Sequence, residues 1–150
     1  MRLVIGGYGQ GKLEFVLGGL DVSEYGVWDG ELPGDGELSG DGELPGVGEV
    51  PRDRELPGDG KWNGFPVVNH FHRWVRGRLM DGGCPEAEIR AFLDRCEDCV
   101  IICDEIGSGI VPGDGFEREY RERTGRILIE LAARAERVER VICGIGQRIK

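Results

Sequence analysis

Hydrophobic residues in this sequence gather into short runs that are typical of buried strands. Residues 2–5, 65–69 and 99–103 are such runs, and the last is continuously apolar, as in a strand covered on both faces of a parallel sheet. Residues 138–145, near the end of the chain, hold further apolar residues on both sides of Glu139 and Arg140. The pattern predicts a strand at each of these places.

The segments between these runs have the spacing of amphipathic helices. One helix is predicted over residues 12–20, a second through Trp74, a third over residues 85–96, and a fourth that Asp114 caps and that reaches about Arg137. The apolar positions that define the buried sides are Leu13, Val16, Leu17 and Leu20 in the first helix, Trp74, Val75 and Leu79 in the second, and Ile89, Phe92 and Leu93 in the third. Strands that alternate with helices in this way predict a three-layer α/β domain with a mainly parallel sheet.

The hydrophobic pattern is interrupted between residues 30 and 60 by a low-complexity repeat. Five six-residue units can be written: GELPGD, GELSGD, GELPGV, GEVPRD and RELPGD. One apolar residue in each unit cannot bury enough surface to offset the entropy lost by ordering so much glycine. We expect a disordered, solvated loop inserted in a single domain of residues 1–150; a stacked hexapeptide coil, an acidic tether and a calcium-binding repeat are weaker alternatives.

Charge and cysteine content narrow the classes of function. The repeat holds nine acidic residues against two arginines, so it carries −7 of the net charge of −9, and the remainder has no cluster of Lys and Arg. Nucleic acid is therefore excluded as a general partner. No apolar run approaches the roughly 20 residues of a membrane span and the start lacks a signal peptide, so a cytoplasmic protein is expected. Five cysteines at irregular spacing fit reduced thiols, and the C-x-x-C at Cys96 and Cys99 lacks the second pair of a metal site.

A glycine-rich segment between the first strand and the first helix matches the phosphate-binding pattern G-x-x-x-x-G-K. Glycines let backbone N–H groups converge on phosphate oxygens, and the lysine reaches the terminal phosphates. The segment predicts binding of ATP or GTP. The predicted nucleotide-binding residues are Gly6, Gly7, Tyr8, Gly9, Gln10, Gly11, Lys12 and Leu13.

Leu13 departs from this pattern, because a working loop has Ser or Thr there as a magnesium ligand. Three interpretations stay open. Mg²⁺ is held by other groups and water, or nucleotide is bound without turnover, or the loop is only a structural turn.

Two acids follow the buried run at residues 99–103, as in a Walker B segment. Ligands of parallel α/β sheets bind at the carboxyl ends of the strands, where Asp104 and Glu105 stand. Asp104 is the predicted Mg²⁺ ligand, and Asp104, Glu105 and Lys12 are the predicted catalytic residues, with the acids serving the metal or the attacking hydroxyl.

The C-terminal half resembles the adenosylcobinamide kinase / adenosylcobinamide-phosphate guanylyltransferase family. The motifs that carry the resemblance are VIICDEIGSGIVP at residues 100–112, EREYRERTGR at 117–126, LAARA at 131–135 and VICGIGQRIK at 141–150. The glycine-rich segment is similar to the P-loop of the same family, so the likeness covers residues 1–17 and about 65–150. It implies a P-loop α/β fold, often oligomeric, that phosphorylates the hydroxyl of adenosylcobinamide with ATP or GTP and then transfers GMP through a guanylylated histidine.

The histidines do not follow the family pattern. Residues 20–64, where the guanylylated histidine is expected, contain none, and the two in the chain are His70 and His72. Aligned with the family, they replace a Cys and a Thr, and Asn69 replaces an Asp. Asn69 is therefore also a predicted nucleotide-binding residue. Relatives often have Asn at the position of Asp104, so the acid gained there is a candidate compensation for the acid lost at position 69. His70 either activates a substrate hydroxyl as a neutral imidazole or makes local hydrogen bonds at a helix start.

The resemblance therefore favours the kinase reaction over guanylyl transfer. The predicted function is that of a nucleotide-binding protein of cobalamin biosynthesis with adenosylcobinamide as the small-molecule substrate. Whether it forms a homo-oligomer stays open. Leu13 and Asn69 favour the first alternative, a non-catalytic nucleotide-binding or partner protein in corrinoid metabolism. A P-loop kinase for another small alcohol is the second.

Overall fold

Six strands form one sheet in the computed structural model, which describes residues 1–19, 26–34 and 66–150. The strand order is β2-β3-β4-β1-β5-β6, and every neighbouring pair is parallel except β5 with β6. The strands are β1 (Arg2–Gly6), β2 (Val27–Asp29), β3 (Val67–Asn69), β4 (Val100–Asp104), β5 (Arg137–Ile142) and β6 (Ile145–Arg148). The helices are α1 (Lys12–Gly18), α2 (Phe71–Met80), α3 (Pro85–Arg95) and α4 (Gly115–Arg134). The predicted α/β class and mainly parallel sheet are confirmed.

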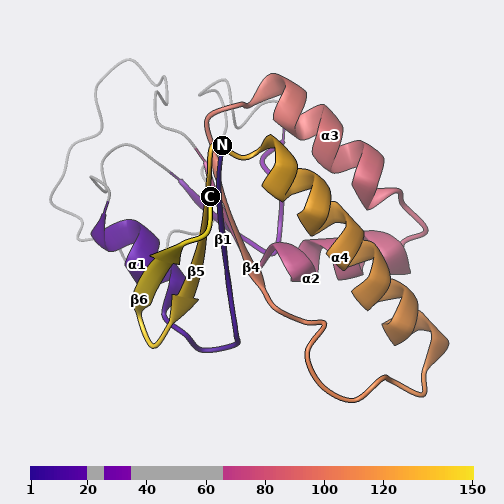
Figure 1. The fold of residues 1–150 in the computed structure, drawn as a ribbon. Coiled ribbons are helices and arrows are strands. Elements are labelled where there is room, and N and C mark those ends of the chain that lie inside the picture. Colours follow the sequence, from indigo (N-terminus) through magenta and orange to yellow (C-terminus); the bar gives the residue numbers. More distant parts are fainter. Residues whose placement is uncertain (20–25, 35–65) are drawn as a thin grey trace, which may run out of the picture.

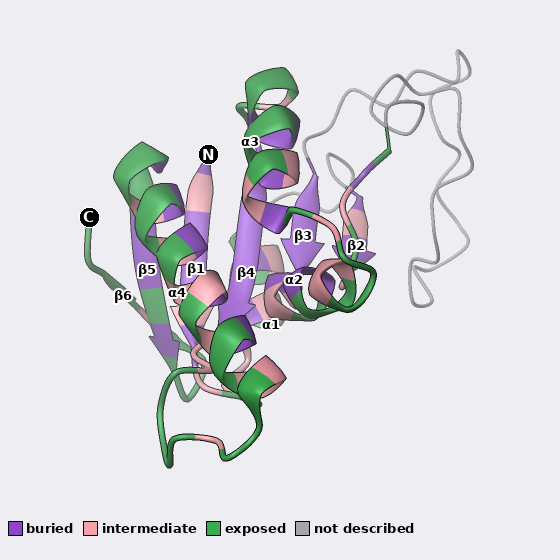
Figure 2. Ribbon diagram, turned by 90° about the vertical axis from the view of Figure 1, so that its right-hand side faces the viewer, coloured by how far each residue is buried: buried purple, intermediate pink, exposed green. Residues whose placement is uncertain are grey.

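Helices cover both faces of the sheet, which makes three layers. Figure 1 shows α1 on one side of the sheet and α2, α3 and α4 on the other. Successive strand residues point to opposite faces, so β1 sends Leu3 to the larger core cluster, under α2 to α4, and Val4 to the smaller one, under α1. Figure 2 shows the inner strands β3 and β4 buried, the edge strand β6 mostly exposed, and the helices buried only along their inner sides.

The ends of α3 and α4 follow from local chemistry. Pro85 opens α3, where its missing N–H costs nothing. Asp114 caps α4 as predicted, because its carboxylate accepts a hydrogen bond of 2.9 Å from the backbone N–H of Glu117. The helix ends at Arg134, three residues before the predicted end, since Arg137 already belongs to β5.

The single strand predicted at residues 138–145 is wrong. The chain instead forms a hairpin in which β5 and β6 are antiparallel. The turn residues Cys143 and Gly144 both have positive φ, 51° and 76°, as in the two-residue turns that suit the twist of paired strands. Gly144 is a turn signal in the sequence, but Cys143 before it replaces the Asn, Asp or Gly that is typical of such turns.

Strand β2 was not predicted at all, because three residues are too few to show a period. Its neighbours fix it, since Val67 N–H donates to Gly26 O at 2.8 Å and Gly30 N–H donates to Asn69 O at 2.8 Å. Residues 35–60 of the repeat, residue 65 and Leu20 lie outside the described residues, so the disordered loop and the single-domain boundary stay predictions. Within residues 1–19, 26–34 and 66–150, no helix has the length and apolar character needed to cross a bilayer.

Candidate nucleotide-binding site

The glycine-rich loop joins β1 to α1 at the carboxyl end of the sheet. Gly9 and Gly11 have φ of 66° and 72°, in the left-handed region that glycine adopts without strain. Gly6 is fixed by space, because a Cβ there would lie 2.4 Å from the carbonyl oxygen of Val141 on β5. In Figure 1 this loop, the β5 to β6 turn and the segment between β4 and α4 lie at the same lower end of the sheet.

Lys12 folds back over the loop to the end of β4. Its Nζ donates to the carbonyl oxygen of Gly7 at 2.8 Å and lies 2.5 Å from Asp104 Oδ1. Both residues are 6% exposed. Asp104 Oδ1 has this ionic contact but no hydrogen-bond partner within the described part of the chain. The structure thus brings together the predicted phosphate lysine and the predicted metal ligand.

His72 faces the other oxygen of Asp104. Its Nε2 lies 3.8 Å from Asp104 Oδ2, and its Nδ1 accepts a hydrogen bond of 3.4 Å from the backbone N–H of Asp104. Burial lowers the pKa of His72 below its ordinary value, against the opposing effect of the Asp104 carboxylate. The shift favours the neutral imidazole, which is hydrogen-bonded to the backbone of Asp104 and lies beside its carboxylate.

A second polar group continues this row across β3 and β2. Asn69 is buried, and its Nδ2 donates to Asp29 Oδ1 at 2.8 Å. His70 Nδ1 contacts the same Asp29 oxygen and lies 3.0 Å from Asn69 Nδ2. The rings of His70 and His72 meet edge to face with their centroids 5.8 Å apart. Polar side chains thus run along the carboxyl ends of four neighbouring strands, from Lys12 beside β1 to Asp29 on β2.

Glu105 does not join Asp104. Its two carboxylate oxygens each lie 2.8 Å from a nitrogen of Arg140, and its backbone N–H donates to Gly6 O at 2.9 Å. Because side chains alternate along an extended chain, a residue that follows Asp104 points to the opposite face. Glu105 ties the end of β4 to β1 and β5, and a metal or base role would require it to leave Arg140.

The remaining loop residues differ in their surroundings. Tyr8 is 82% exposed. Gln10 is held by the hairpin turn, because its side-chain oxygen accepts from Cys143 N–H at 2.7 Å and its carbonyl accepts from Gly144 N–H at 2.9 Å. Leu13 is half-buried and packs against the smaller core cluster, the one under α1. The structure explains Leu13 by packing.

Asp29 and the β5 to β6 turn are parts of this end of the sheet that the sequence did not reveal. The signal for Asp29 was weak, an acid after two apolar residues and before a glycine. The signal for the turn was Gly144 alone, because Cys143 before it is not a typical turn residue.

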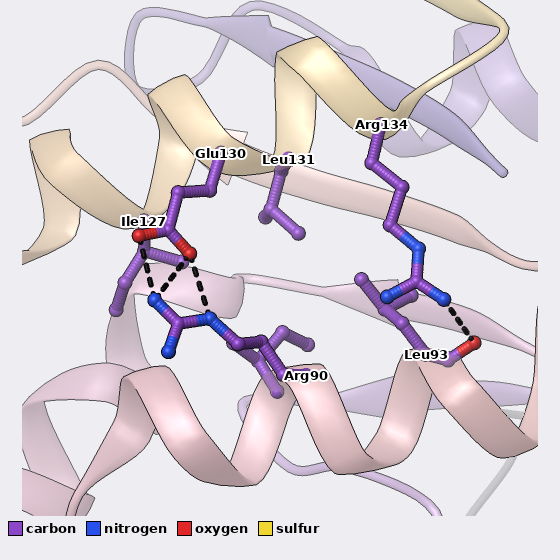
Figure 3. A pocket seen from close by; sticks show the side chains of 7 residues that line it. Arg90, Leu93, Ile127, Glu130, Leu131 and Arg134 are labelled. Carbon is purple, nitrogen blue, oxygen red and sulfur yellow. Dashed lines mark hydrogen bonds and ion pairs between the residues drawn. The ribbon is translucent and has the colours of Figure 1, made fainter.

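A separate surface pocket lies between α3 and α4. Figure 3 shows Arg90 pairing with Glu130 and Arg134 donating to the carbonyl oxygen of Leu93 across it. Ile89, Ile127 and Leu131 are among the residues that line it. It shares no residue with the row at the strand ends, and its ion pairs fasten one helix to the other.

A parallel sheet with a strand, a glycine-rich loop, a lysine and a helix in sequence defines the P-loop class of α/β proteins. The family model described as cobinamide kinase / cobinamide phosphate guanyltransferase matches residues 72–149, and the chain belongs to this family. The matched part includes Asp104 and Glu105, whereas the glycine-rich loop, Asp29 and His70 precede it.

Two curated relatives carry the same name, bifunctional adenosylcobalamin biosynthesis protein CobU. The protein from Escherichia coli is 40% identical over 68 residues, which are 43% of this chain and 38% of the relative. The protein from Salmonella typhimurium is 39% identical over 67 residues, 42% of this chain and 37% of the relative. The chain thus matches less than two-fifths of the length of either relative.

Proposed function

We propose that the protein binds ATP or GTP with Mg²⁺ on the loop of residues 6–12 and transfers the γ-phosphoryl group to the hydroxyl of adenosylcobinamide. The observation that carries this proposal is the buried pair of Lys12 and Asp104, 2.5 Å apart at the end of that loop. A lysine held over a phosphate-binding loop and a carboxylate at the end of the neighbouring strand are the two charges that a Mg²⁺ nucleotide requires.

The charge balance of this pair favours nucleotide and metal arriving together. Each member neutralises the other, and an unpaired charge at such a buried position is costly. Free nucleotide would compensate Lys12 but leave Asp104 unpaired. Bound Mg²⁺ neutralises Asp104 while the phosphates neutralise Lys12, so neither charge is left without a partner in the complex.

The residues present fit Mg²⁺ of this kind. Mg²⁺ is commonly held by one or two carboxylates, with substrate phosphates and water filling its other positions. In the part of the chain that the structure describes, no group of three or more His, Cys, Asp or Glu side chains forms a metal cluster, so no dedicated cage competes with this arrangement. Asp104 would hold the ion, which supplies charge neutralisation of the phosphates. Leu13, packed on the core, would contribute no ligand.

The acceptor and the choice of reaction come from the family. Its description names cobinamide kinase, and both relatives are named for adenosylcobalamin biosynthesis. The resemblance gives neither His70 nor His72 the place of the guanylylated histidine, and the chain has no other histidine. We therefore assign the kinase reaction and not guanylyl transfer. A cytoplasmic homo-oligomer without nucleic acid is part of the same proposal.

A non-catalytic nucleotide-binding protein is the second candidate. Leu13 and the engagement of Asn69 with Asp29 favour it, because neither position offers the metal a ligand of the usual kind. A kinase for another small alcohol is the third, since the acceptor rests on the family alone.

One pair of labelling reactions separates these candidates. Purified protein is incubated with γ-labelled ATP or GTP, Mg²⁺ and adenosylcobinamide, and separately with α-labelled GTP. Label on the corrinoid without a protein-bound GMP is the expected result. Nucleotide binding with no label transfer would identify the non-catalytic protein, transfer only to other alcohols would change the acceptor, and a GMP adduct on His70 or His72 would show that guanylyl transfer is retained.

A further inference from the structure

The two histidines of the row have opposite hydrogen-bonding arrangements. His72 Nδ1 accepts from the backbone N–H of Asp104, so its proton is on Nε2. Two groups face His70 Nδ1, a carboxylate oxygen of Asp29 and, at 3.0 Å, Asn69 Nδ2. The amide donates to Asp29 Oδ1 at 2.8 Å, and a carboxylate only accepts, so the Asp29 contact places the proton of His70 on Nδ1. His70 therefore presents an unprotonated Nε2, whereas His72 does not.

Asp29 is held in place by three residues at the end of β3 and in the start of α2. Its Oδ1 receives Asn69 Nδ2 at 2.8 Å as well as His70 Nδ1, and its Oδ2 lies 3.9 Å from Arg73 Nη1. The parallel register places Asp29 beside Asn69. Asn69 is thereby a support for the carboxylate and not a free polar group.

The backbone of His70 directs the ring to this carboxylate. His70 has φ 49° and ψ 43°, the left-handed conformation, at the position before α2. A residue with a side chain rarely adopts this conformation unless its surroundings hold it there. The imidazole side chain is 27% exposed, so a ligand can reach it.

We propose that His70 is the general base for the acceptor hydroxyl and that Asp29 is the positioning residue that fixes its tautomer. The inference rests on the kinase reaction proposed above. Its location supports it, because His70 meets His72 at 5.8 Å, His72 lies 3.8 Å from Asp104, and Asp104 lies 2.5 Å from Lys12. The base and the phosphate lysine thus belong to one continuous row at the carboxyl ends of adjacent strands.

The proton and electron balance of the step is complete without another reactant. The hydroxyl oxygen of the acceptor forms a bond to the γ-phosphorus while its proton passes to His70 Nε2. The bond from the γ-phosphorus to the bridging oxygen breaks, and its electron pair leaves with the nucleoside diphosphate. Asp29 stabilises the imidazolium until the proton is released to water.

Nitrogen NMR of histidine-labelled protein at slightly alkaline pH tests the arrangement without turnover. The wild type is expected to show one neutral ring protonated on Nδ1 and one on Nε2. Asp29→Ala should move the His70 signal away from the Nδ1 form and leave His72 unchanged. The matched control is Asp81→Ala, an exposed aspartate that also pairs with an arginine, Arg78 at 3.6 Å. It should leave both signals in place.

Turnover supplies the second measurement. His70→Ala should lower kcat about 100-fold and Asp29→Ala at least about tenfold, with the KM for nucleotide unchanged. Asp29→Glu should restore part of the loss, and Asp81→Ala should behave as wild type. A shifted tautomer with unchanged kcat, or an unshifted one, overturns the inference while the kinase stands. A wild type that binds Mg²⁺ nucleotide but phosphorylates no alcohol overturns both.

Discussion

Lys12 and Asp104 form a buried ion pair, with 2.5 Å between Nζ and Oδ1 and less than a tenth of either side chain exposed. The lysine begins α1 and the aspartate ends β4, so the pair joins the phosphate loop to the neighbouring strand. It is a structural contact and the proposed ligand site at once. Substitutions there should therefore act on stability and binding in separable ways.

Lys12→Met should lower the free energy of unfolding by about 3 kcal/mol, because it leaves the Asp104 carboxylate buried without a counter-charge. The double variant Lys12→Met, Asp104→Asn removes both charges and should recover most of that loss while still failing to bind nucleotide. Urea denaturation of the single and double variants measures the coupling. Arg126 and Glu122, an exposed pair on α4, provide the control cycle and should show almost no coupling. Equal coupling energies in the two cycles would contradict the conclusion that Lys12 and Asp104 neutralise each other as a buried pair.

Asp104→Asn should abolish the dependence of nucleotide binding on Mg²⁺. The amide keeps the size of the side chain but no longer balances a divalent cation. Calorimetric titration with ATP or GTP, in Mg²⁺ and again in EDTA, should show at least about tenfold tighter binding with Mg²⁺ for the wild type and no difference for the variant. Asp114→Asn keeps a capping side chain on α4 and is the control. Retained Mg²⁺ dependence in Asp104→Asn would place the metal elsewhere.

The elements with strong local signals were predictable from the sequence. The run of β4 is apolar throughout because both faces are covered, and Asp114 caps α4 through its own side chain. The meeting of Lys12 and Asp104 followed from a rule, since the carboxyl ends of parallel strands share one edge. The separation of Glu105 from Asp104 could have been predicted as well, from the alternation of side chains in extended chain.

The polar partners of His70 could not be predicted, because they depend on a strand that the sequence does not announce. Asp29 reaches His70 only because β2 pairs with β3 in a register that places Asp29 beside Asn69. That register comes from tertiary contacts on three residues, too few for a hydrophobic period. The hairpin that holds Gln10 gave only a weak signal, because Cys143 stands before Gly144 in place of the usual Asn, Asp or Gly.

The ion pair between Glu86 on α3 and Arg123 on α4 should make stability depend on pH. The hydrogen bonds from Arg123 lower the pKa of Glu86 from 4.5 to about 2. A carboxylate whose pKa is lower in the folded than in the unfolded state stabilises the fold at any pH above its unfolded-state pKa. This contribution is lost as the pH falls from about 4.5 toward 2.

Glu86→Gln should therefore destabilise the protein at pH 6 by about 1 kcal/mol, a value reduced for solvent screening, and by much less near pH 2. Chemical denaturation at several pH values measures the difference. The control is Glu130→Gln, which breaks another ion pair between the same helices, the one with Arg90. This variant should keep the contribution of Glu86 to the pH dependence. A Glu86→Gln curve parallel to the wild-type curve would contradict the assignment.

Removing residues 36–60 should leave the melting temperature within about 2 °C of wild type, because the repeat has too few apolar residues to bury a core of its own. The deletion spares residues 30–34, where Gly30 N–H donates to Asn69 O and Leu32 packs against the larger core cluster. Thermal denaturation scans compare the melting temperature of this variant with that of a variant that lacks residues 30–60. The longer deletion should melt several degrees lower, and a large loss in the shorter one would mean that the repeat packs on the domain.

Leu13→Thr should tighten the binding of Mg²⁺ nucleotide, because it returns a hydroxyl to the position of the usual metal ligand on the phosphate loop. The same change should destabilise the fold by about 1 kcal/mol, since Leu13 is half-buried against the smaller core cluster. Calorimetric titration and urea denaturation measure the two effects on one sample.

Leu17→Thr separates the added ligand from the lost packing. Leu17 lies one turn further along α1 and packs half-buried on the same cluster, but it is outside the phosphate loop. This control should lose similar stability and gain no affinity. If both variants bind Mg²⁺ nucleotide as the wild type does, the hydroxyl is not the missing ligand, and Leu13 is retained for packing in a site that holds its metal through Asp104 and the phosphates.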